Sequence, residues 1–80
     1  MPKIKGWKKI KSTKNEEKWF NKKREEYVSI FNQGDYWDLM VKDRYGSSAL
    51  IEYAKIQDLK NLTKDYVKSK AIKYMKNNPW

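Results

Sequence analysis

Two stretches of alternating side chains, joined by a tight-turn sequence, constrain the fold of this 80-residue chain most strongly. The stretches cover residues 27–31 and 36–41, and both are rich in the β-branched and aromatic residues that suit a half-buried strand. The segment between them contains Gly34, which adopts the positive φ of a tight turn without steric cost. The pattern therefore predicts a β-hairpin over residues 26–43.

The two arms of this hairpin agree on which side chains face a core. Side chains alternate between the two faces of a strand, so every second residue belongs to the same face. The inward set is Val28, Ile30, Trp37, Leu39 and Val41. The opposite face mixes aromatic and polar side chains, namely Tyr27, Ser29, Phe31, Tyr36, Asp38 and Met40.

One further strand is predicted on each side of the hairpin, over residues 16–21 and 49–56. The inward face of the second is ambiguous. We expect Ile51 and Tyr53 to face inward, because the alternative set would bury Glu52 without a partner. A β-bulge would exchange the two faces partway along this strand.

The first 15 residues have no clean hydrophobic period and predict an irregular or partly extended arm. Trp7 and Ile10 are the residues expected to pin this arm to the body. Trp7 has two interpretations: it anchors the arm in the core, or it stacks on a nucleic-acid base. In the strand that follows, Trp19 is expected to face inward.

A helix is predicted over residues 63–77. Either Asn61 or Thr63 is placed to cap its first turn, and the Asn-Asn-Pro sequence at residues 77–79 ends it with a left-handed Asn. At helical spacing, the apolar stripe consists of Val67, Ala71, Tyr74 and Met75.

Together these elements predict an α+β fold, an antiparallel β-meander of three to four strands with one C-terminal helix packed on one face. The predicted organisation is a basic N-terminal arm at residues 1–15 and a single β-β-β-β-α domain at residues 16–80. One helix covers only one face of a sheet, so the inward set of the hairpin should meet the apolar stripe of the helix.

The strands followed by the helix resemble small sheet-plus-helix DNA-binding modules of the AP2-like and integrase arm-binding type. Thr63, Lys64 and Ala71 carry this resemblance, since a Thr-Lys segment opens the helix and Ala lies on its inner face. The spacing WKKIKS…KWFN…YVSIF…YWDLMV also resembles short archaeal proteins of no known role. The Gly-, Arg- and Trp-rich strand features of plant AP2 domains are missing, so no base-reading residue is carried over. The resemblance implies DNA binding.

The net charge of +9 is concentrated at the two ends of the chain. Residues 1–15 carry +6 and residues 59–80 carry +5, whereas residues 27–58 carry −2. Seventeen Lys against two Arg is typical of a solubilising surface, but the segregation also indicates a footprint for a polyanion.

The sequence therefore favours a small nucleic-acid-binding protein whose lysines contact phosphates with little sequence specificity. The predicted contacts are Lys3, Lys5, Lys8, Lys9, Lys11, Lys14, Lys70, Lys73 and Lys76. A second version stacks unpaired bases on Tyr27, Phe31 and Tyr36, although Asp35 and Asp38 lie on or near that face and would repel phosphates. The alternative class is a protein-interaction or homodimerisation module that uses the same aromatic face.

Enzymatic activity is not expected, because the chain lacks both Cys and His. A site would need paired carboxylates, a Lys or a Ser activated by one. The candidate carboxylates are Asp35, Asp38, Asp43 and Glu52, and Asp38 and Glu52 are expected to share a sheet face. No metal or cofactor is expected.

No apolar run exceeds three residues, so neither a membrane span nor a secretory signal is predicted, and a cytoplasmic location is the expectation.

Overall fold

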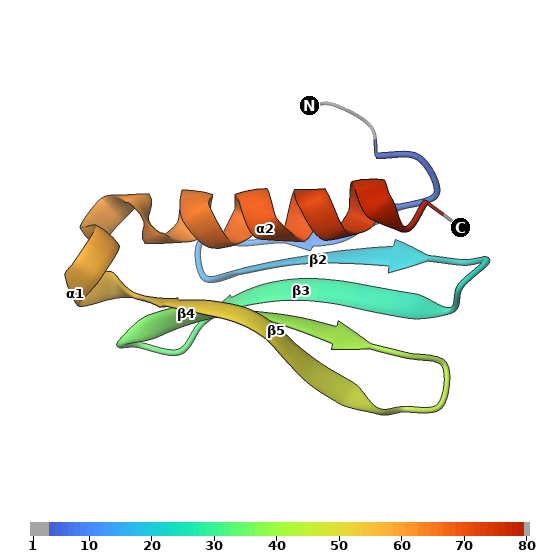
Figure 1. Ribbon diagram of the computed structural model, residues 1–80, viewed down its shortest axis with the longest axis horizontal. Helices are drawn as coiled ribbons and strands as arrows, with labels where there is room; N and C mark the ends of the chain where they lie inside the picture. The colour runs from blue at the N-terminus through green and yellow to red at the C-terminus, as the bar shows by residue number, and fades with distance from the viewer. Residues whose placement is uncertain (1–3, 80) are drawn as a thin grey trace.

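Five antiparallel strands follow one another along the chain and form a single sheet in sequence order, in a computed structural model that describes residues 4–79. The strands are β1 (Lys8–Ser12), β2 (Glu16–Asn21), β3 (Glu26–Asn32), β4 (Tyr36–Lys42) and β5 (Ser48–Lys55). A short helix α1 (Ile56–Leu59) and a 3-10 turn η1 (Lys60–Leu62) lead into the helix α2 (Thr63–Asn77). Figure 1 shows α2 running along the sheet, with both ends of the chain at the same end of the molecule.

The α+β class and the single long C-terminal helix are confirmed, but the sheet has five strands rather than three to four. The additional strand, β1, lies within the segment predicted to be an irregular arm. Its alternation is hidden in the sequence because the register shifts between Lys9 and Lys11, which leaves Ile10 as an extra residue. Trp7 is buried as an anchor, with 7% of its surface exposed, whereas Ile10 is 48% exposed and does not pin the segment.

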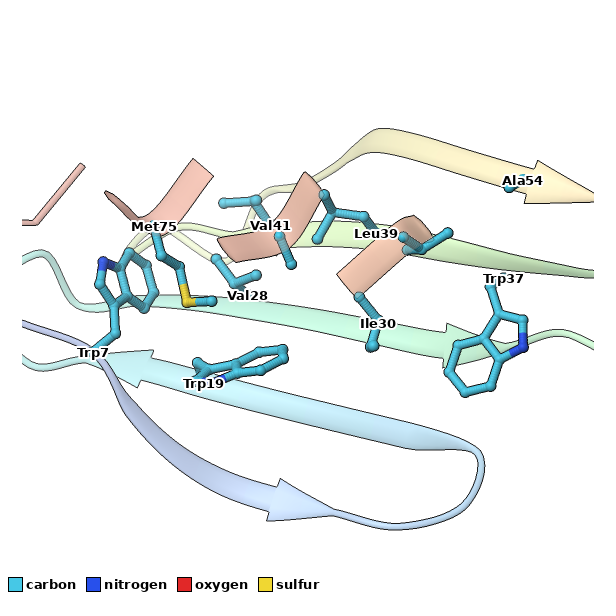
Figure 2. Packing of buried hydrophobic residues seen from close by; sticks show 11 residues of the cluster. Trp7, Trp19, Val28, Ile30, Trp37, Leu39, Val41, Ala54 and Met75 are labelled. Atoms are coloured by element: carbon cyan, nitrogen blue, oxygen red, sulfur yellow. The ribbon is translucent and has the colours of Figure 1, made fainter. Parts of the chain in front are cut away.

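The core lies between α2 and one face of the sheet, which we call the covered face. The predicted inward set of the hairpin and Trp19 are buried there, against the predicted helix stripe. Figure 2 shows the indole rings spread along this core, from Trp7 beside Met75 at one end to Trp37 at the other. Each large aromatic ring removes much apolar surface from water, which compensates for the small size of the domain.

The inward residues predicted for the last strand are wrong. Leu39 pairs with Glu52 and Met40 pairs with Leu50, so Ile51 is an extra residue in a bulge and the faces exchange at this point. As a result, Tyr53 lies opposite Asp38 on the other face of the sheet, and Ala54 takes the buried position beside Trp37.

The two basic ends of the chain are held together. The Trp7 indole donates a hydrogen bond to the Asn78 carbonyl at 2.8 Å, and the Asn21 amide donates to the Pro79 carbonyl at 2.9 Å. Gly6 has a φ of +85°, and a Cβ at this position would lie 1.8 Å from the Pro79 oxygen. Only glycine fits this close approach.

The bounds of α2 match the prediction, but its caps do not. The Thr63 hydroxyl donates to the Lys60 carbonyl at 2.6 Å, so it supports the preceding turn and does not cap a later N–H group. Asn78 is not left-handed, because its φ is −136°. Its side chain donates to the Tyr74 carbonyl at 2.8 Å, which satisfies one of the free carbonyls at the helix end.

Candidate functional site

The face of the sheet opposite α2, which we call the open face, is rich in aromatic side chains. Strand pairing places Phe20 beside Tyr27, Phe31 beside Asp38, Asp38 beside Tyr53, and Tyr36 beside Lys55. The face therefore carries five rings from four strands: Phe20, Tyr27, Phe31, Tyr36 and Tyr53. All of them except Phe20 are exposed, and no helix of residues 4–79 packs over them.

Four of the five rings form two pairs. Phe20 and Tyr27 lie with their centroids 4.7 Å apart, and the Lys18 ammonium lies 5.8 Å from the Tyr27 ring centroid. Tyr36 and Tyr53 meet edge to face with centroids 5.9 Å apart. Contacts of this kind are weakly favourable, so they group the rings without fixing them and leave their apolar surfaces available on the sheet.

Lysines surround these rings on the same face. Lys8 pairs with Phe20, Lys42 with Tyr27 and Lys55 with Tyr36, and none of the three forms an ion pair within the described chain. Lys11 and Lys18 stand opposite each other on β1 and β2, an arrangement of like charges that lowers stability.

The open face is therefore net positive, with five lysines against two carboxylates, Glu16 and Asp38. Glu16 forms an ion pair with Lys11 at 2.9 Å. Asp38 is buried, and one of its oxygens accepts a hydrogen bond from the Gln33 amide at 2.8 Å. The uncompensated charge left on this face is thus carried by lysines at its surface.

The lysines that the sequence singled out do not form one surface. Lys8 and Lys11 lie on the open face, whereas Lys9 lies on the covered face and Lys14 in the turn between β1 and β2. Lys5 comes just before Gly6, at the end where the termini meet, and Lys3 is outside the described residues. Lys70, Lys73 and Lys76 belong to α2, on the other side of the sheet from the open face. Their role in binding stays a prediction.

Lysines from the two ends of the chain do converge on the covered face, but around a carboxylate. Glu17 is buried and its oxygens lie 2.8 Å from the Lys9 ammonium, 3.1 Å from that of Lys64 and 3.2 Å from that of Lys68. Burial raises the pKa of Glu17, but the three ammonium groups outweigh it and lower this pKa to about 2. This cluster ties β1 and β2 to α2, and the three ammonium groups share one carboxylate, so the cluster keeps a net positive charge.

The carboxylates considered for chemistry are separated by the fold. Asp38 lies on the open face and Glu52 on the covered face, so the expectation that they share a face is wrong. Asp43 accepts backbone hydrogen bonds from Tyr45 and Ser47 and so shapes its turn. Asp35 lies in the turn before β4. Within residues 4–79, no group of three or more acidic side chains is placed to hold a metal ion.

Two rings of the open face, Phe20 and Tyr53, were not among the predicted stacking residues. Phe20 follows Trp19 in a predicted strand, so simple alternation from an inward Trp19 points to it. Tyr53 carries no such signal, because the bulge at Ile51 reverses its face.

Comparisons with protein-family models, with curated proteins and with solved structures give no match to this chain. No helix in the described part of the chain is both long and apolar enough to cross a membrane.

Proposed function

We propose that this protein binds single-stranded nucleic acid on the open face of its sheet. The observation that carries the proposal is the combination, on one face, of five aromatic rings with lysines, most of which form no ion pair with residues 4–79. Aromatic rings stack on unpaired bases, and lysines neutralise the phosphates that connect them. Both contacts tolerate any sequence, so stacking and phosphate contacts by themselves give little specificity.

Single strands fit this face better than a duplex. The bases of a duplex stack on one another, and their flat faces are closed to side chains. Rings such as Phe31 and Tyr53 on the face of a sheet have no base face to stack on in a duplex. Unpaired bases can instead lie against the rings in succession, as they do on other sheet-based single-strand binders.

Salt dependence on matched single and double strands tests this proposal. Labelled DNA and RNA strands, alone and annealed to their complements, are titrated with the protein by fluorescence anisotropy at low and high salt. We expect the single strands to bind with a salt slope of about −0.7 per phosphate contact and the duplexes to bind more weakly. Failure of every single strand to bind in a salt-dependent way would disprove the proposal.

Two triple variants with the same charge change identify the surface that binds. Replacing Lys18, Lys42 and Lys55 by Gln removes charge from the open face, and replacing Lys70, Lys73 and Lys76 by Gln removes it from α2. The open-face variant should reduce the salt slope by about 2, since about 0.7 is lost per contact, and the helix variant should leave it nearly unchanged. A larger effect of the helix variant would place binding on the surface that the sequence alone suggested.

A homodimer through the open face is the alternative. It is favoured by Leu50, Ile51 and Tyr53, which are exposed on the edge strand β5. It is opposed by the net positive charge of the face, because two copies would bring like charges together. Size-exclusion chromatography at low and high salt separates the two: a dimer at both salt concentrations supports an interface, whereas a monomer leaves the rings free to stack.

A further inference from the structure

One carboxylate of the open face has hydrogen-bonding capacity that nothing in the described chain uses. Asp38 sits in the middle of β4 with 5% of its surface exposed. Its Oδ2 atom accepts the Gln33 amide hydrogen bond at 2.8 Å, and its Oδ1 atom accepts none from residues 4–79. Buried carboxylate oxygens are normally paired, so an unused one at the centre of a candidate site points to a ligand.

The side chains that flank Asp38 on the open face are aromatic rings. Its cross-strand neighbours are Phe31 and Tyr53, and Tyr36 precedes it by two residues on the same face. These three rings are exposed, and exposed side chains change rotamer within picoseconds to nanoseconds. A base that stacks on this group of rings can therefore reach the carboxylate when a ring turns aside.

The chemistry of this carboxylate selects one kind of base edge. An ionised carboxylate only accepts hydrogen bonds, and Oδ2 still has a free lone pair beside the unused Oδ1. We propose, on the basis of the proposed single-strand binding, that Asp38 binds the Watson–Crick edge of an unpaired guanine stacked among Phe31, Tyr36 and Tyr53. Guanine presents two adjacent donors there, the N1–H and the 2-amino group, which match the two oxygens of a carboxylate.

The other bases match less well. Adenine and cytosine present one amino group next to a ring-nitrogen acceptor, which faces a carboxylate oxygen unfavourably. Thymine and uracil present one N–H group between two carbonyl oxygens. A phosphate is repelled outright by the negative charge. In this proposal Asp38 binds a base, although its charge repels phosphates. The surrounding lysines contact the phosphate backbone of the nucleic acid.

Inosine provides the sharpest test, because it differs from guanosine only by the absence of the 2-amino group. Short thymidine oligonucleotides with isolated guanines, which cannot form quadruplexes, are compared by anisotropy with the same strands carrying inosine, adenine or cytosine at those positions. One bidentate contact corresponds to a gain of roughly 5- to 150-fold in affinity for guanine over thymine. Inosine should lose most of this gain.

The variant Asp38→Asn tests the residue, since the amide is close in shape and can still pair with Gln33. We expect it to bind oligothymidine at least as well as the natural protein and to lose the guanine preference. Asp35→Asn is the matched control, because it makes the same charge change in the turn before β4 and should keep the preference. Circular dichroism establishes that each variant is folded.

The outcomes separate the two proposals. If oligothymidine binds with salt dependence but guanine and inosine strands bind no better, the guanine site is overturned and single-strand binding stands. If Asp38→Asn keeps the guanine preference, the assignment of Asp38 is wrong. If Asp38→Asn does not fold, the inosine comparison on the natural protein decides. If no strand binds, both proposals are overturned.

Discussion

Each face of the sheet has one buried carboxylate in the described chain, and the two have different hydrogen-bonding and charged neighbours. On the covered face, Glu17 is surrounded by three ammonium groups from β1 and α2. On the open face, Asp38 has one amide partner and one unused oxygen. The covered face also encloses the apolar core, whereas the open face leaves its rings exposed.

Under the proposed function, stability and recognition are assigned to opposite sides of one sheet. On the covered face, burial of apolar side chains stabilises the fold, and three ammonium groups favour the charged form of Glu17. The open face keeps opposed like charges, exposed rings and an unpaired acceptor, none of which is favourable for the free protein. Features that oppose stability in this way are typical of functional sites.

The largest expected effect is loss of a core ring on the covered face. Trp37→Ala should lower the free energy of unfolding by about 3–5 kcal/mol, because it removes a buried ring that the surroundings refill only in part. Tyr53→Ala, on the open face, should cost about 1 kcal/mol or less. Urea denaturation followed by circular dichroism measures both. Equal losses of unfolding free energy in the two variants would contradict the claim that the covered face contributes more to stability than the open face.

The next effect concerns Glu17 and its dependence on pH. The pKa of Glu17 is lowered from 4.5 to about 2 in the folded protein, so its stabilisation is fully present above pH 4.5 and is lost as the pH falls toward 2. Glu17→Gln should therefore cost about 2–3 kcal/mol at neutral pH and much less near pH 2.

Glu16→Gln is the control for that measurement, because it removes a neighbouring acid whose partner Lys11 is half exposed. Surface ion pairs contribute little, so its cost should stay below about 1 kcal/mol at every pH. Denaturant unfolding of both variants across this pH range makes the comparison. A cost of Glu17→Gln that does not vary with pH would contradict the role given to the three lysines.

The smallest expected effect on stability accompanies a clear effect on binding. Phe31→Leu keeps apolar bulk on the open face but removes a ring, so single-strand affinity should fall by about 1–3 kcal/mol while stability changes by about 1 kcal/mol or less. Tyr66→Leu removes a ring of matching exposure, 38% against 39%, from α2 and should leave affinity unchanged. Anisotropy titrations measure both, and equal losses would argue against the open face as the site.

Local sequence pattern was sufficient for the hairpin and for α2. The inward positions of Val28 and Ile30 follow from alternation within one strand, and those of Val67 and Ala71 follow from helical spacing. These periods are properties of the backbone, and a tight turn such as that at Gly34 sets the register between neighbouring arms. Such features need no knowledge of distant residues.

Only the tertiary structure decided the two edges of the sheet and the site. A single extra residue, Ile10 in β1 and Ile51 in β5, reverses every side chain beyond it, and no composition marks a bulge in advance. The bulge at Ile51 is what brings Tyr53 beside Asp38. The contrast between Glu17 and Asp38 likewise depends on which residues from distant segments surround each carboxylate, and that is a property of packing rather than of local pattern.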